Sequence, residues 1–277
     1  MFRNLLVHIP TERAVRPVID VAIALAAARR SHLDAVAIGY ESMSAVGMVV
    51  EGGSAAVAAV MGVEEERAQE RANAAISVFE VEAKLAGIEY GTRTFAAIPA
   101  DAEQHVGALS RLYDMTIVLQ PEGGNASYDD IIPQGVLFNS GGPMLMVPHT
   151  HKGPLETRHV GIAWDGSWLA ARAVRDAMPF LMGAKAVTVI AVNEDARTAS
   201  SNDLVSHLGR RGIAARVQGV TVDRGNIQGA ILSIVAESAI SLLVMGGFGH
   251  SRLQERILGG VTREMFQSMT VPVLMSH

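Results

Sequence analysis

The sequence of 277 residues contains no cysteine, and only 5% of its residues are aromatic. The absence of cysteine excludes disulfides, thiol catalysis and cysteine-ligated metals, and it fits a reducing cytoplasm. Charged residues are also few, at 18%, and the net charge is −5. Because a nucleic-acid-binding face needs a basic patch or stripe, we expect no nucleic-acid partner.

Long hydrophobic runs are missing as well. The alanine-rich stretches Val18–Ala28 and Ser54–Val63 are too short, or too interrupted by glycine and charge, to span a bilayer. The apolar run before Pro10 is too short for a secretory signal. We therefore expect a soluble, cytoplasmic protein without a membrane partner.

Short apolar runs alternate with helix-length segments, and this order occurs twice. In the first half, strands are predicted at Phe2–Ile9, His32–Gly39, Ile88–Phe95, Met115–Gln120 and Met144–Val147, and helices at Val15–Arg30, Ala100–Arg111 and Tyr128–Asn139. In the second half, strands are predicted at His159–Trp164, Ala186–Val192, Ile213–Gln218, Leu242–Met245 and Val271–Met275, and helices at Leu169–Met182, Asn202–Arg211, Ile227–Ser238 and up to Ser268. Such runs are typical of a parallel sheet covered on both faces.

The repeated order predicts two α/β domains, each a five-stranded parallel sheet with helices on both faces. Their expected bounds are 1–148 and 157–277, with the polar segment 149–156 as a linker. About 30 extra residues, within 42–71, separate the second and third strands of the first half. Their apolar part, Val49–Val63, is expected to be buried at an interface; a lid over the binding site is the alternative.

Glycines gather after the fourth strand of the second half, within Ser241–Phe266. Glycine allows backbone N–H groups to approach an anion closely, and a helix N-terminus favours negative charge. The stretch therefore predicts a phosphate-binding loop. The alternative is a turn in which the glycines only supply the required backbone angles.

Two other strand ends are expected at the same edge of the sheet, where ligands of such folds bind. They are Ala163–Ser167 (AWDGS) and Val192–Glu194. Asp165 and Ser167 could instead only cap a helix. Trp164 and Trp168 are expected in the core, and His207 and His277 in solvent.

The spacing Gly246-x2-Gly249-x9-Gly259, together with AWDGS, resembles the nucleotide-binding motif of the universal stress protein family. The resemblance extends over the chain as a tandem pair, with the motif in the second half alone. It implies two flavodoxin-like (adenine nucleotide alpha hydrolase-like) domains, binding of ATP, ADP or AMP with Mg²⁺ as an option, and a role in stress adaptation. The nucleotide-binding residues expected from it are Ala163, Asp165, Ser167, Val192, Gly246, Gly247, Gly249, His250, Arg252, Gly259, Gly260, Val261 and Thr262.

In this assignment Asp165 contacts the adenosine part, and the backbone of Val192 lines the adenine. Gly260 stands where the family usually has serine or threonine, so one hydroxyl donor is missing and Thr262 is the candidate to replace it. Family members commonly dimerise through the last strand. The resemblance therefore implies that Met144–Val147 and Val271–Met275 pair within the chain as a pseudo-dimer, and it leaves room for a homodimer.

The first half departs from the motif. It has Pro10 and Thr11 after its first strand, and Pro121 and Glu122 after its fourth. Proline lacks an N–H donor and glutamate repels phosphate, so we expect no conventional nucleotide site there. No catalytic residue and no metal site is predicted, apart from Asp165 acting through a magnesium nucleotide. A non-catalytic nucleotide-binding protein is the leading interpretation; a slow ATP hydrolase, or a small-molecule binder using the first domain, is the alternative.

Overall fold

The computed structural model describes residues 2–41, 55–124, 126–194, 198–247 and 261–277. The first half contains β1 (Asn4–Ile9), α1 (Arg16–Arg29), β2 (His32–Tyr40), α3 (Ala55–Ala86), β3 (Tyr90–Ala97), α4 (Pro99–Leu109), the 3-10 turn η1 (Ser110–Leu112), β4 (Met115–Leu119), the 3-10 turn η2 (Tyr128–Ile131), α5 (Ile132–Asn139) and β5 (Met144–Val147). The second half contains β6 (His159–Trp164), α6 (Trp168–Asp176), α7 (Met178–Leu181), β7 (Ala186–Val192), α8 (Ser201–Gly209), β8 (Ala215–Val220), η3 (Arg224–Asn226), α9 (Ile227–Glu237), β9 (Leu242–Gly246), α11 (Val261–Ser268) and β10 (Val273–Ser276).

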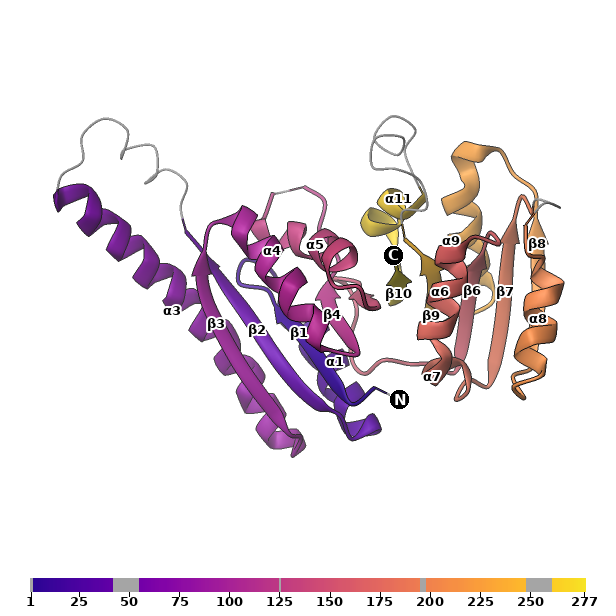
Figure 1. The fold of residues 1–277 in the computed structure, drawn as a ribbon, viewed down its shortest axis with the longest axis horizontal. Helices are drawn as coiled ribbons and strands as arrows, with labels where there is room; N and C mark the ends of the chain where they lie inside the picture. Colours follow the sequence, from indigo (N-terminus) through magenta and orange to yellow (C-terminus); the bar gives the residue numbers. More distant parts are fainter. Residues whose placement is uncertain (1, 42–54, 125, 195–197, 248–260) are drawn as a thin grey trace.

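The described strands form one ten-stranded sheet in the order β3-β2-β1-β4-β5-β10-β9-β6-β7-β8 (Figure 1). Within each half all neighbouring strands are parallel. The halves meet at β5 and β10, which pair antiparallel through Val273 beside Met146, Leu274 beside Leu145 and Met275 beside Met144. The predicted pairing of these two final strands within the chain is therefore confirmed.

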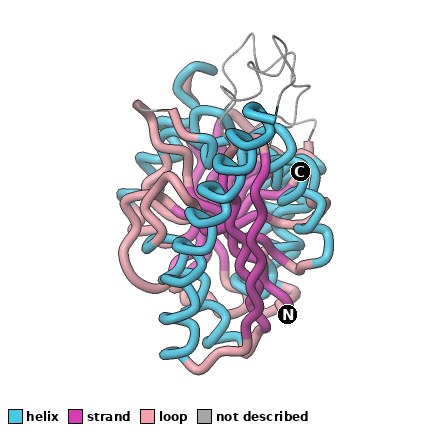
Figure 2. The backbone as a smooth tube through the Cα atoms, turned by 90° about the vertical axis from the view of Figure 1, so that its left-hand side faces the viewer, coloured by secondary structure: helices cyan, strands magenta, loops and turns pink. Residues whose placement is uncertain are grey.

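Helices cover both faces of the sheet (Figure 2). Side chains from α1, α3, α6 and α8 share one apolar cluster with the strands, and side chains from α4, α5, α9 and α11 share the other. The four inner strands β4, β5, β10 and β9 are buried almost throughout, whereas β3 and β8 at the two edges are partly exposed. The continuous apolar runs in the sequence thus correspond to strands with a helix layer on each side.

Some predictions differ from the structure. The helix predicted at Leu169–Met182 is divided into α6 and α7, because Pro179 has no N–H to continue the hydrogen-bond ladder. The strand predicted from Ile213 begins at Ala215, because the N–H of Ile213 bonds to the carbonyl of Leu208 and closes the preceding helix. Trp164 is buried as expected, but the prediction for Trp168 is wrong, since 65% of its surface is exposed.

The additional length of the first half lies between β2 and β3. Here α3 is 32 residues long, against 9 for α8 at the corresponding position in the second half. In Figure 1 α3 extends beyond the edge of the sheet. Residues 42–54, which include much of the predicted apolar insertion, lie outside the described residues. Among the described residues, no helix is long and apolar enough to cross a membrane.

Candidate functional site

The predicted site lies at the carboxyl end of β6, where the strand order of the second half reverses. β6 pairs with β7 on one side and with β9 on the other. Ala163 lies beside Ile190 of β7 and Met245 of β9. In open parallel sheets this reversal is the place where ligands bind.

The turn between β6 and α6 is organised by hydrogen bonds. Asp165 is exposed, and its Oδ1 accepts the N–H of Ser167 at 2.9 Å. Ser167 caps α6, because its Oγ accepts the N–H of Ala170 at 3.1 Å. The capping role considered from the sequence is therefore present. The second oxygen of Asp165 accepts no hydrogen bond from the described residues.

Gly246 ends β9 beside this turn, and Gly247 follows it. A Cβ at Gly246 would lie 2.7 Å from the backbone nitrogen of Ala170 and 2.8 Å from the carbonyl carbon of Leu169. Only glycine therefore allows the first turn of α6 to lie against the end of β9. The same contact brings the positive end of the α6 dipole to the start of the glycine-rich loop.

Val192 is the last residue of β7, and Asn193 follows it with a φ of +52°. The side-chain amide of Asn193 donates to the carbonyl of Val222 and accepts its N–H, both at 2.8 Å. These two bonds hold the chain after β8 against the end of β7. Asn193 lies within the predicted strand end Val192–Glu194, but this bridging role of its side chain was not predicted; asparagine's tolerance of left-handed backbone is a signal that could have indicated it.

Residues 198 and 199 lie over the turn after β6. Trp164 Nε1 donates to the carbonyl of Ala199 at 2.9 Å, and a Cβ at Gly166 would come within 2.5 Å of the Thr198 side chain. The segment after β7 thus helps to shape the turn that carries Asp165. No local sequence pattern identifies this contact, because it joins two loops.

The first half also contributes to the end of β9. A Cβ at Gly247 would lie 3.0 Å from the Leu137 side chain of α5. His277 donates from Nδ1 to the carbonyl of Gly247 at 2.9 Å, and its ring packs edge-on to Phe138 at a centroid distance of 4.7 Å. The prediction that His277 is solvated is therefore wrong. The His277 side chain instead holds the backbone of Gly247, which precedes the glycine-rich loop.

The remaining predicted residues fall on segments that are not described. Gly249, His250, Arg252, Gly259 and Gly260 lie outside the described residues. Val261 and Thr262 open α11, and of these two residues only the backbone is described.

Strand register relates the first half to the second. Leu5 lies beside Met115 in the first half as Val160 lies beside Leu242 in the second. By this register His8 corresponds to Ala163. Gln120 corresponds to Gly247, and each donates its N–H to the last strand of its own half.

Small residues of the second half are thus replaced by larger polar ones. His8 and Gln120 are each only 2% exposed, and the His8 Nε2 and Gln120 Oε1 atoms are buried without a hydrogen-bond partner among the described residues. The positions of Ala163 and Gly247 are thus taken in the first half by the buried side chains of His8 and Gln120.

Backbone groups of the first half are also occupied. By the same register Ile38 corresponds to Val192, and its carbonyl accepts a hydrogen bond from Thr11 Oγ1 at 2.7 Å. The N–H groups of Thr11 and Glu12 donate to Oδ2 of Asp129 at 3.0 and 2.7 Å. Tyr40 donates its hydroxyl to Oδ1 of the same carboxylate at 2.9 Å. The Asp129 carboxylate thus already accepts hydrogen bonds from donors that could otherwise bind an anionic ligand.

Burial sets the charge states of this cluster. Burial raises the pKa of Asp129 to about 6, against the opposing effect of its hydrogen bonds. Burial lowers the pKa of His8 to about 3. His8 is therefore neutral at pH 7, and its 3.9 Å approach to Asp129 is not an ion pair.

The second half of the chain matches a known protein family by sequence. The family model described as "Universal stress protein family" matches residues 156–277. No curated protein matches the chain.

Solved structures resemble the whole chain. A universal stress protein from Archaeoglobus fulgidus superposes with a TM-score of 0.71 at 18% sequence identity. The alignment covers 98% of this chain and 95% of the Archaeoglobus fulgidus chain. A putative universal stress protein from Pseudomonas aeruginosa has a TM-score of 0.61 at 13% identity, covering 99% and 93%. At these identities the likeness establishes the fold alone. Residues 156–277 are thus a universal stress protein domain by sequence, and the entire chain has the fold of these structures.

Proposed function

We propose that the chain is a cytoplasmic adenine-nucleotide-binding protein of stress adaptation, with one nucleotide site in its second half and no catalytic activity of its own. In this proposal residues 1–148 and 157–277 are two flavodoxin-like domains joined by the linker 149–156. The first domain completes the sheet as a pseudo-dimer partner.

One observation carries the proposal. Within the region that matches the family, Asp165, Val192 and Gly246 lie at the ends of three neighbouring strands, where the strand order reverses. A nucleotide at this place would meet a carboxylate, a strand-end backbone and a glycine-rich loop. Each of these suits a different part of the ligand.

The roles follow from the chemistry of the groups. The second oxygen of Asp165 is suited to accept hydrogen bonds from ribose hydroxyls, and the backbone at Val192 is suited to the edge of the adenine. Backbone N–H groups at Gly260, Val261 and Thr262, at the N-terminus of α11, are suited to phosphate. Because Gly260 supplies no hydroxyl, we expect weaker phosphate binding than serine or threonine would give at this position.

The first domain is expected to bind no nucleotide in the corresponding place. Asp129 already accepts the N–H groups of Thr11 and Glu12, and the Ile38 carbonyl is bonded to Thr11. A phosphate would have to displace a buried carboxylate of the same charge. One nucleotide per chain is therefore the expected stoichiometry.

The test is identification of nucleotide released from the purified protein by mass spectrometry, followed by calorimetry with ATP, ADP and AMP. Gly259→Val should abolish binding, because a branched side chain would block the loop. The control is Gly209→Val, at an exposed site where an added Cβ meets nothing within 4 Å. Unchanged affinity in Gly259→Val would refute the site.

The hydrolase alternative is tested on the same samples. Prolonged incubation with ATP and magnesium should release no phosphate above the protein-free blank. Release that Asp165→Asn abolishes would replace the non-catalytic proposal with a slow ATP hydrolase centred on this carboxylate.

A further inference from the structure

A second candidate site lies between the two halves, at the opposite end of their strands. This cleft has a volume of about 710 Å³, within the range of about 300–1,000 Å³ that is usual for small-molecule sites. Phe2, Asp114 and Pro143 line it from positions just before β1, β4 and β5. The cleft is therefore separate from the glycine-rich loop, which follows the carboxyl end of β9.

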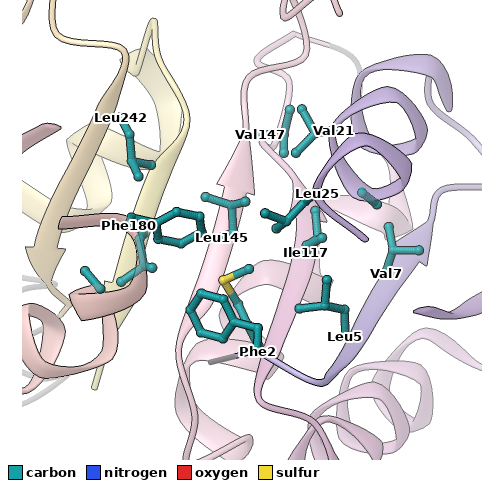
Figure 3. Packing of buried hydrophobic residues seen from close by; sticks show 14 of the residues in the cluster. Phe2, Leu5, Val7, Val21, Leu25, Ile117, Leu145, Val147, Phe180 and Leu242 are labelled. Carbon is teal, nitrogen blue, oxygen red and sulfur yellow. The ribbon is translucent and has the colours of Figure 1, made fainter. Parts of the chain in front are cut away.

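The second half supplies the facing wall from the end of α6, from α7 and from the turn after α7. Met178, Pro179 and Met182 lie along it. Phe2 packs against Phe180 at a ring distance of 5.2 Å, and Figure 3 shows both rings near Leu145 at the boundary of the halves. Met182 is 68% exposed. Unbranched, polarizable methionine adapts to apolar ligands of different shape.

The two carboxylates of the cleft are already engaged. Asp114 Oδ2 accepts the N–H groups of Arg3 and Asn4 at 2.5 and 2.9 Å. Asp176 Oδ2 accepts the Ser276 hydroxyl at 2.7 Å and lies 3.8 Å from Arg172 Nε. Neither carboxylate is within 4.0 Å of an arginine that lines the cleft.

The two arginines of the cleft have no carboxylate partner among the described residues. Arg29 donates to the carbonyl of Pro179 at 3.1 Å, and its guanidinium lies 5.5 Å from the Phe180 ring. Arg175 is exposed, and its side chain makes no hydrogen bond or ion pair with any described residue. The cleft is lined by two arginines, Arg29 and Arg175, and two aspartates, Asp114 and Asp176, so the formal charges of its lining cancel.

We propose that this cleft binds a small amphipathic carboxylate, with its head group on Arg175 and its aliphatic chain against Met178 and Met182. Guanidinium groups bind carboxylates through two parallel hydrogen bonds. Because Asp114 and Asp176 also line the cleft and repel negative charge, a monoanion is favoured over a dianionic phosphate ester.

The test uses decanoate as the probe and ¹³C-methyl-labelled methionine as the reporter. The Met178 and Met182 methyl signals, assigned with Met178→Leu and Met182→Leu, should shift saturably in the full chain. Arg175→Gln should weaken decanoate binding at least about tenfold, because it removes a charge-assisted pair. Arg210→Gln, at an exposed arginine in the second half, is the control and should leave affinity unchanged.

Two further probes separate the contributions of charge and chain. Decanol should bind at least about tenfold more weakly than decanoate, and decyl phosphate should bind no more tightly. Equal binding of decanol, unchanged affinity in Arg175→Gln, or shifts confined to other methionines would overturn the proposal. Tighter binding of decyl phosphate would overturn the preference for a monoanion. Met182→Glu should abolish decanoate binding while leaving the circular dichroism spectrum unchanged.

Discussion

Replacing Asp129 by asparagine should stabilise the protein at neutral pH and leave its stability nearly unchanged in mild acid. The pKa of this carboxyl is raised from 3.8 to about 6 in the folded state. A difference of about 2 pH units corresponds to roughly 3 kcal/mol, because each unit is worth about 1.4 kcal/mol. Above pH 6 the wild-type protein keeps a buried charge, which the asparagine variant lacks.

The direction in which the free energy of unfolding changes with pH depends on which state binds more protons. Between about pH 4 and 6 the folded state holds a proton on Asp129 that the unfolded state has lost, so this group lowers the free energy of unfolding as pH rises. His8 acts in the opposite direction, because its folded pKa of about 3 lies below the unfolded value of 6.5 and stability rises with pH between them. Both proteins retain His8, so the difference between them isolates Asp129.

The assay is urea unfolding of wild type and Asp129→Asn, followed by circular dichroism from pH 4 to pH 8. The variant should be more stable by about 3 kcal/mol at pH 8 and by nearly zero at pH 4. Tyr40→Phe should move the window to higher pH, because it removes a hydrogen bond that lowers the Asp129 pKa. A difference that stays constant within about 0.5 kcal/mol across this range would refute the reasoning.

Three further predictions concern packing, capping and assembly. Gly246→Ala should destabilise the protein by about 1–3 kcal/mol in urea unfolding, since the new Cβ meets the α6 backbone; Gly247→Ala should cost less, because the Leu137 side chain can move. Equal costs would contradict this contrast. Ser167→Ala should cost about 1 kcal/mol by the same assay through loss of the α6 cap, and no loss would show that the cap is replaced. Deleting residues 44–62 should change the oligomer size in light scattering if the predicted apolar insertion lies at an interface, and an unchanged size would count against that role.

Much of the fold follows from the sequence, because each apolar run is the length of a strand and glycine or proline stands near its ends. Predicted helix and strand boundaries are wrong where a residue fits the pattern of one element but its backbone ends another. Ile213 reads as a strand residue, but its N–H closes the helix before it. Pro179 was placed inside a helix although its missing N–H ends one.

Contacts in the candidate site can be predicted from the sequence where they are local, but not where they depend on tertiary structure. Gly246 and Asp165 stand at strand ends in the sequence itself. The roles of His277 and Asp129 depend on partners 30 and more than 110 residues away. Periodicity cannot report such pairs, and a histidine or aspartate in a polar segment looks solvated until its neighbours are known.

The antiparallel junction of β5 and β10 has a consequence for synthesis on the ribosome. Met144 and Met275, which face each other there, are 131 residues apart in the chain. At a synthesis rate of about 5–20 residues per second, β10 is made roughly 7 to 26 s after β5. Throughout that time its unpaired edge can accept a finished β10 from a neighbouring chain. Crowded polysomes should therefore favour domain-swapped dimers, in which each β5 completes its sheet with the last strand of another molecule.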